Sequence, residues 1–116
     1  MRAVQIRVLG GAMARKPNDA TAFAHRDRGM LVNVAAMYVD PAEKETHDGW
    51  VEGIARTLGK NGAGGYVGFL GDDDEETIRA AYPGGNWERL RGLKRRYDPD
   101  NLFRLNHNIP PAALKT

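Results

Sequence analysis

The sequence from position 82 to 111 reads Tyr82-Pro-Gly-Gly-Asn-Trp-Glu-Arg-Leu-Arg-Gly-Leu-Lys-Arg-Arg-Tyr-Asp-Pro-Asp-Asn-Leu-Phe-Arg-Leu-Asn-His-Asn-Ile-Pro-Pro111. Four large apolar residues in its first half recur three or four positions apart, as one face of a helix requires. They are Trp87, Leu90, Leu93 and Tyr97. Asp98-Pro99 must end this helix, because proline disfavours helical backbone at the residue before it. The stretch therefore predicts an amphipathic helix, a turn, and a short terminal segment.

The predicted helix is strongly basic, although the formal charge of the whole chain is only +2. Its cations are Arg89, Arg91, Lys94, Arg95 and Arg96, and Glu88 is its only acid. Such a patch is one signature of nucleic-acid binding. However, cations at the carboxy-terminal end of a helix also complement its dipole. We therefore favour a solvated or partner-facing helix surface over a nucleic-acid interface.

Composition places the chain among soluble globular proteins. Its 116 residues allow one domain with a modest core, and 41% are apolar and 28% charged. No apolar run is long enough to predict a membrane span, and the charged amino-terminal stretch does not read as a secretory signal. The absence of cysteine excludes disulfides, thiolate chemistry and a cysteinyl flavin link. We expect a cytoplasmic location.

Three extended segments are predicted in the first third of the chain. Residues 4–9 alternate in polarity and end at Gly10-Gly11. Residues 22–26 form a short second segment, which a hairpin turn at residues 27–29 would join to the third. Residues 30–39 carry apolar side chains on both faces, which is typical of a central strand.

A helix is predicted to follow. Asp40 can cap it, Pro41 suits its first turn and Glu43 completes a capping box. Its buried stripe would contain Trp50, Val51, Ile54 and Leu58, and Gly59 with Asn61-Gly62 would end it. Residues 65–71 predict a fourth strand, and the acids of residues 72–76 suit the start of a short helix reaching Tyr82.

This order predicts an α+β fold. We expect residues 1–116 to form a single domain, with a small, mainly antiparallel sheet of three to four strands and three helices packed on it. So small a sheet leaves its edges open, so we also expect a homo-oligomer formed by edge pairing.

Several kinds of site are disfavoured by the pattern of residues. His25, His47 and His107 lack metal-ligand spacing, and the acid run lacks the pattern of a calcium loop, so no metal site is predicted. The glycine-rich residues 59–65 follow a helix and precede a strand, the reverse of a phosphate loop. The chain contains no serine, which excludes serine hydrolase chemistry.

Tyr66 is the one candidate catalytic residue that the residue types single out. A tyrosine acts as a general base only where its site lowers its pKa, which is near 10 in water. Its flanking glycines let a flat ligand or another backbone come close. A tyrosine packed at a sheet edge is the more common interpretation of such a position.

Residues 82–111 resemble the carboxy-terminal signature of FAD-linked oxidases of the berberine bridge enzyme family. Three further blocks, residues 7–12, 19–26 and 66–70, look like consecutive blocks of the bacterial members. The resemblance thus covers almost the whole chain. It identifies residues 1–116 as similar to the end of the substrate-binding domain, with residues 82–111 as the berberine-bridge-type terminal segment.

The resemblance implies a flavin site. In this family an amino-terminal domain binds FAD, and the sheet of the substrate domain covers the isoalloxazine ring. The segment similar to residues 106–110 returns to the flavin domain, which makes Asn106 and Asn108 candidate cofactor-binding residues. Tyr66, or the nearby position of Phe69, corresponds to a strand that supplies an active-site tyrosine. The implied cofactor is FAD, and Tyr66 is the candidate catalytic residue.

The chain itself carries no dinucleotide fingerprint and no sequence similar to a flavin domain. Met1 directly precedes a block that is internal in the full-length proteins, which suggests a truncated or split gene or an excised domain. The first hypothesis is therefore a substrate- and flavin-covering domain of an FAD-dependent oxidoreductase, inactive alone and completed by an FAD-binding domain or partner chain. The second is a stand-alone binding module that kept the fold without redox activity. A nucleic-acid-binding domain is the third.

Overall fold

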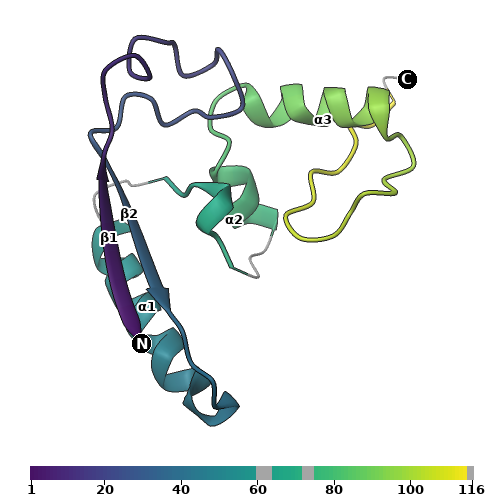
Figure 1. Ribbon diagram of the computed structural model, residues 1–116. Coiled ribbons are helices and arrows are strands. Elements are labelled where there is room, and N and C mark those ends of the chain that lie inside the picture. The colour runs from purple at the N-terminus through teal and green to yellow at the C-terminus, as the bar shows by residue number, and fades with distance from the viewer. Residues whose placement is uncertain (60–63, 72–74, 115–116) are drawn as a thin grey trace.

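The computed structural model describes residues 1–59, 64–71 and 75–114. Its elements, in order, are β1 (Arg2–Val8), β2 (Met30–Ala36), the 3-10 turn η1 (Pro41–Glu43), α1 (Lys44–Gly59), the 3-10 turn η2 (Val67–Phe69), α2 (Glu75–Ala80) and α3 (Asn86–Tyr97). Figure 1 shows β1, β2 and α1 as one arm of the molecule, with α2, α3 and the terminal segment beside it. The α+β class predicted from the sequence is confirmed.

The described residues form one antiparallel sheet of two strands, β1 and β2. The register pairs Arg2 with Ala36 at one end and Val8 with Met30 at the other. Helix α1 packs against β2 (Figure 1). The outer edge of β1 pairs with nothing among the described residues, and all seven of its residues are exposed.

The expected sheet of three to four strands is therefore not found, and the first reason lies at residues 22–26. This segment is a loop: the backbone N–H of Arg26 donates to Asn18 Oδ1 at 2.9 Å, and that of Arg28 donates to the His25 carbonyl at 3.3 Å. Side-chain and turn hydrogen bonds thus replace a strand ladder. The predicted hairpin was wrong, because β2 pairs with β1.

The predicted strand at residues 65–71 is also absent. The backbone folds into η2, where the Phe69 N–H donates to the Tyr66 carbonyl at 2.9 Å and the Leu70 N–H to the Val67 carbonyl at 3.3 Å. Glycines in and around this segment leave little side-chain surface to hold an extended strand. Tyr66 therefore lies at the start of a turn.

The bounds of the helices agree with their sequence signals, but the predicted buried stripe of α1 does not form: Trp50, Val51 and Ile54 are half-buried and Leu58 is exposed. Asp40 Oδ1 accepts the Ala42 N–H at 2.9 Å, Pro41 opens η1, and α1 continues to Gly59. Helix α3 covers Asn86–Tyr97 and ends before Pro99, as predicted. Residues 60–63, with the predicted Asn61-Gly62 stop, and residues 72–74 of the acid run lie outside the described residues. In the described part, no helix has both the length and the apolarity that crossing a bilayer requires.

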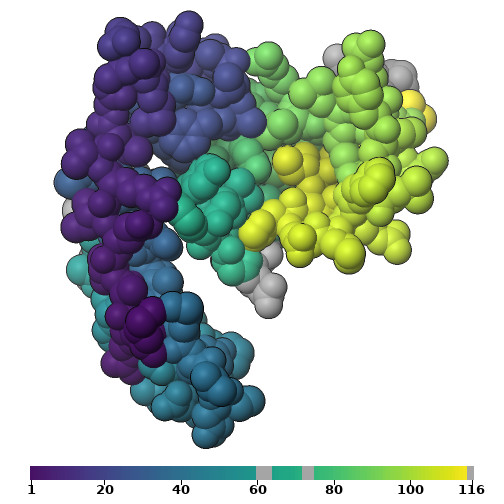
Figure 2. Space-filling model, viewed as in Figure 1, coloured from purple at the N-terminus to yellow at the C-terminus, as the bar shows by residue number. Residues whose placement is uncertain are grey.

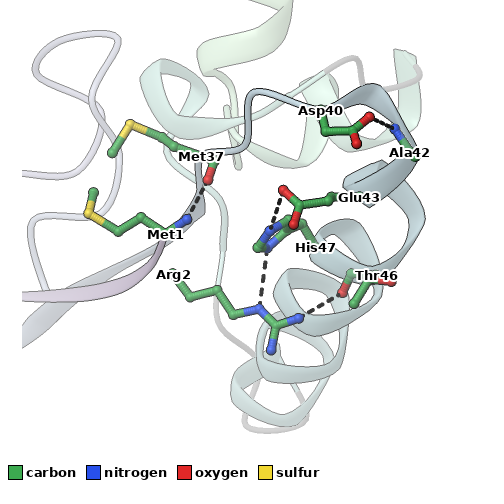
Figure 3. A network of polar contacts seen from close by, with 8 residues as sticks. All are labelled: Met1, Arg2, Met37, Asp40, Ala42, Glu43, Thr46 and His47. Atoms are coloured by element: carbon green, nitrogen blue, oxygen red, sulfur yellow. Dashed lines mark hydrogen bonds and ion pairs between the residues drawn. The ribbon is translucent and has the colours of Figure 1, made fainter.

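A polar network ties β1 to α1 (Figure 3). Arg2 donates from Nε to His47 Nδ1 and from Nη2 to the Thr46 carbonyl, both at 3.3 Å, and its guanidinium lies 5.5 Å from the centre of the Trp50 ring. The His47 ring stacks on Tyr38, with ring centres 5.5 Å apart. This network fixes the end of β1 on the helix.

The packing is loose for a chain of this size. Ala24, Ile78, Ala81 and Trp87 are the buried apolar residues of the described part. The radius of gyration is 16.4 Å, whereas a compact domain of this length has about 13 Å. The accessible surface is 8719 Å², against about 6,300 Å² for a compact monomer of this mass. Figure 2 shows the resulting extended outline.

Candidate functional site

Three aromatic rings gather around the predicted catalytic position. The Tyr66 ring makes edge-to-face contacts with Phe23, at 5.7 Å between ring centres, and with Phe69, at 5.4 Å. We call Phe23, Tyr66 and Phe69 the aromatic cluster. It joins the loop before β2 to the turn η2, two segments more than 40 positions apart in the sequence and each placed by its own turn hydrogen bonds.

Arginines lie at both ends of the aromatic cluster. The guanidinium of Arg26 lies 5.6 Å from the centre of the Phe23 ring, and that of Arg7 lies 5.3 Å from the centre of the Phe69 ring. These distances fit cation–π contacts. The cluster therefore presents aromatic rings bordered by positive charge, a combination that suits a flat, electron-rich or anionic ligand.

Two glycines make room for the cluster. A Cβ at Gly68 would lie 2.8 Å from Tyr66 Cε1, and a Cβ at Gly64 would lie 2.4 Å from His25 Cε1. His25 is buried, and its Nε2 lies 2.9 Å from the Gly65 carbonyl oxygen. The glycine content around η2 thus has a packing reason, which the sequence alone did not reveal.

Tyr66 is 41% exposed, and its side chain makes no hydrogen bond to another described residue. Its phenol interacts electrostatically with Tyr82. Burial is the main reason why the pKa of Tyr82 is raised above 10.0, and the Tyr66 charge adds to that effect. No described residue therefore takes up the hydrogen-bonding capacity of the Tyr66 hydroxyl.

The predicted cofactor residues lie on a turn. Asn106 adopts the left-handed backbone conformation, with φ of 59°, and its carbonyl accepts the Asn108 N–H at 2.9 Å. Between them, His107 Nε2 lies 2.8 Å from the Gly71 carbonyl oxygen. This contact joins the terminal segment to the segment that carries Tyr66, although no hydrogen bond links Tyr66 to either asparagine among the described residues.

Asn108 differs from Asn106 in its surroundings. Asn106 is exposed, whereas the Oδ1 atom of Asn108 is buried and has no hydrogen-bond partner in the described structure. A buried amide oxygen without a donor is costly and calls for an explanation. Asn108 thus offers a free acceptor beside the tethered turn.

Asp98 organises the backbone of the terminal segment, whereas the sequence had predicted it only as a helix stop. Its buried carboxylate accepts the backbone N–H of Leu102 at 2.8 Å and of Phe103 at 3.0 Å, and Lys94 Nζ donates to it. The hydrogen bond from Lys94 is the main reason why the pKa of Asp98 is lowered from 3.8; the two backbone N–H groups act in the same direction, and burial opposes them. The sequence signal for this role was Asp98 itself, the first residue of the Asp-Pro-Asp-Asn motif.

The terminal segment then returns along α3. Arg91 Nε donates to the Pro110 carbonyl at 3.4 Å, and the Ala112 N–H donates to the Arg91 carbonyl at 3.1 Å. Figure 1 shows this return as the yellow loop beside α3. Helix α3 is itself joined to the loop before β2, since Asn86 Nδ2 donates to the Asn18 and Thr21 carbonyls at 3.2 Å.

A groove of about 430 Å³ lies near α2 and α3. Its lining residues are Glu76, Arg79, Ala80, Tyr82, Pro83, Gly84, Trp87 and Glu88. It contains none of the residues predicted to act on a flavin or a substrate. Among the described residues, no three histidine or acidic side chains gather as metal ligands.

Residues 65–110 match the family model "Berberine and berberine like". The chain is 38% identical over 105 residues to the uncharacterized FAD-linked oxidoreductase YgaK of Bacillus subtilis (strain 168), and 34% identical over 103 residues to YvdP of the same organism. It is 27% identical over 127 residues to berberine bridge enzyme-like 17 of Arabidopsis thaliana.

These matches cover nearly all of this chain but little of each relative. They include 90%, 89% and 95% of the chain, and 23%, 23% and 24% of the relatives. The chain thus spans less than a quarter of the length of the curated relatives that it matches. Residues 65–110 thus match this family model, and the chain is similar to part of longer proteins named FAD-linked oxidoreductases.

Proposed function

We propose that this chain is the carboxy-terminal substrate- and flavin-covering part of an FAD-dependent oxidoreductase, and that it requires an FAD-binding domain carried elsewhere for activity. Two observations together support the proposal: the chain matches only a small part of each relative, and its accessible surface is large for its mass. Nearly all of the chain matches under a quarter of each relative. Its accessible surface of 8719 Å² exceeds that of a compact monomer by roughly 2,400 Å².

The residues present fit one side of a flavin ring. The aromatic cluster offers apolar ring faces bordered by Arg7 and Arg26. Asn108 offers an amide oxygen without a donor, which suits a ring N–H. When bound, the flavin supplies the hydride chemistry. This chain has no fingerprint for the cofactor's pyrophosphate, so that contact belongs to the FAD-binding part.

Within this proposal Tyr66 is the catalytic residue, while Asn106 and Asn108 bind the cofactor. Tyr66 has an exposed ring and a hydroxyl without a described partner, as a group that meets a substrate requires. A neighbouring cation would have to favour its phenolate, because tyrosine ionises near pH 10 in water. Arg7 and Arg26 are the described cations at the borders of its cluster.

Two partners are proposed for this chain. The FAD-binding part is the principal one, and the unpaired edge of β1 supports pairing with a second copy of the chain as well. The lack of cysteine favours a cytoplasmic setting. The alternative function, a stand-alone binding module without redox activity, draws support from the groove beside Tyr82 and Trp87.

The test compares the isolated chain with a graft. In the YgaK graft, this chain replaces the matched 105-residue segment of the Bacillus subtilis relative. We expect the purified isolated chain to show no stoichiometric flavin absorbance, and the YgaK graft to retain flavin. A graft without flavin would contradict the proposal, and tight FAD binding by the isolated chain would show that no second part is needed.

A further inference from the structure

The guanidinium of Arg26, at one border of the aromatic cluster, contacts only neutral groups in the described part of the chain. Its Nη1 atom donates to the Met13 carbonyl at 3.4 Å and its Nη2 atom to Thr21 Oγ1 at 2.6 Å. The Nε atom is buried and makes no hydrogen bond to a described residue. Arg26 as a whole is half-buried. A charge that is partly withdrawn from water is normally paired, so Arg26 has unused capacity for an anion.

Other arginines of the chain do have acidic partners. Arg28 lies 3.8 Å from the Asp27 carboxylate, and Arg91 pairs with a glutamate one turn earlier on α3. Arg7, at the other border of the aromatic cluster, instead donates to the neutral amide oxygen of Gln5 at 3.1 Å. Both borders of the cluster therefore carry a positive charge that no carboxylate among the described residues neutralises.

The aromatic rings between the two borders are partly exposed. Tyr66 is 41% and Phe69 40% exposed, and Phe23 is half-buried. The centre of the Phe23 ring lies 5.7 Å from that of Tyr66 and 5.6 Å from the Arg26 guanidinium. Aromatic ligands gain from offset or edge contacts with such rings. An aromatic molecule in contact with Phe23 would therefore lie close to both Tyr66 and a guanidinium.

We propose that the substrate is an aromatic carboxylate and that Arg26 selects it by binding the carboxylate, an inference that rests on the proposed function and adds the chemical class of the substrate. Once the FAD-binding part covers the cluster, the guanidinium loses water, and a neutral substrate would leave its charge uncompensated. A carboxylate offsets that loss with charge-assisted hydrogen bonds to the Nη atoms, each of which has a second N–H. Both borders would repel a cationic substrate.

Arg26, rather than Arg7, is the selecting residue because its guanidinium is held in place. The hydrogen bonds to Thr21 and Met13 and the contact with the Phe23 ring fix its position before a ligand arrives, which lowers the entropy lost on binding. Arg7 is exposed on β1, where water and salt screen its charge. We therefore expect Arg7 to add to the attraction of an anion without deciding between substrates.

The test uses the YgaK graft and two matched probes, benzoate and benzamide, which share their size and planarity and differ in charge. The change in flavin absorbance at neutral pH measures the binding of each probe. We expect benzoate to bind at least about tenfold more tightly than benzamide. Arg26→Gln should abolish this preference and leave the affinity for benzamide unchanged. Arg28→Gln, at an exposed arginine that pairs with Asp27, is the matched control and should keep the preference.

The possible results separate the inference from the proposed function. A YgaK graft without flavin overturns the proposed function, and the inference with it. A graft that keeps flavin but does not prefer benzoate, or in which Arg26→Gln keeps the preference, overturns the inference alone. Loss of both probes in Arg26→Gln assigns Arg26 a structural role, also against the inference. If Arg26→Gln does not fold, Arg26→Lys keeps the charge without the planar fork and should lower the preference to an intermediate value; an unchanged preference would contradict the role of Arg26.

Discussion

At the scale of single residues, Asp98 organises the terminal segment. One carboxylate holds two backbone N–H groups and the Lys94 ammonium, so the turn after α3 has a defined shape even though its apolar side chains face water. Charge-assisted hydrogen bonds of this kind are stronger than neutral ones. The motif Asp-Pro-Asp-Asn therefore does more than end a helix.

Replacing Asp98 by Asn should loosen this turn. The amide keeps the shape but loses the charge, so we expect the Leu102 and Phe103 amides to exchange at least about tenfold faster at neutral pH. Hydrogen exchange followed by NMR measures this, and Asp100→Asn, on an exposed neighbour, is the matched control. Equal exchange in both variants would contradict the role of Asp98.

The same variant tests a pH dependence. The pKa of Asp98 is lowered below 3.8 in the folded chain, so its carboxylate stabilises the turn above that pH and stops doing so as the pH falls through the lowered value. We therefore expect the difference between wild type and Asp98→Asn to be full at pH 7 and to shrink only in acid below about pH 4. A difference that disappears near neutral pH would point to another group.

Replacing Gly64 and Gly53 by alanine should change the free energy of unfolding in opposite directions. A Cβ at Gly64 would meet the buried His25 ring at 2.4 Å, so Gly64→Ala should destabilise the chain by about 1–3 kcal/mol. Gly53 lies within α1 with nothing within 4 Å of its Cβ position, so Gly53→Ala should stabilise it by about 1 kcal/mol. Urea unfolding measures both, and a neutral Gly64→Ala would contradict the packing of His25.

At the scale of elements, the sequence predicted the bounds of the helices, because capping residues and prolines set these bounds locally. The cap at Asp40 and the proline after Asp98 placed α1 and α3 correctly, whereas the stripe around Trp50 was expected to be buried and is not. The strands predicted at residues 22–26 and 65–71 were wrong, because turn and side-chain hydrogen bonds form there in place of a strand ladder. The partner of β2 was wrong because strand pairing is a long-range contact that no local pattern reveals.

The residues of the candidate site also fall into two groups: those that the sequence identified and those that only the tertiary structure reveals. Tyr66 was singled out by residue type and by a family resemblance, and the turn carrying Asn106 and Asn108 by the resemblance alone. The neighbours that shape these positions are Phe23, Arg7 and His25, which come from distant parts of the chain. Their roles depend on tertiary contacts, so residue types and spacing alone could not identify them.

The unpaired edge of β1 predicts that the isolated chain associates with itself. Ile6 is exposed at the middle of a strand whose outer hydrogen-bonding groups are unpaired, and a lysine on an edge strand opposes edge pairing. We expect the isolated chain to associate with increasing concentration and Ile6→Lys to remain monomeric in sedimentation velocity. Met37→Lys, at an exposed position after β2, should behave like wild type. Association that survives Ile6→Lys would assign the contact to another surface.

At the scale of the whole molecule, the chain has many ordered local contacts and a small core. The buried apolar residues of the described part lie in the loop before β2, around α2 and in α3, and none lies in β1 or α1. Stability should therefore be uneven, since the arm of β1, β2 and α1 depends on a few contacts such as the Arg2 network. A larger assembly that covers the arm would remove this weakness.

The isolated chain should accordingly unfold with a low dependence on denaturant. The slope of unfolding free energy against urea follows the surface exposed on unfolding, and this chain leaves roughly 2,400 Å² more surface in water than a compact monomer does. We expect a slope below that of compact domains of equal length, and small-angle scattering at low concentration should give a radius of gyration above about 13 Å. In the YgaK graft the same segment should unfold together with the flavin signal, because its open surfaces are then covered. An isolated chain with a steep, single transition and a compact scattering profile would mean that the fold is complete without a partner, which would favour the stand-alone binding module.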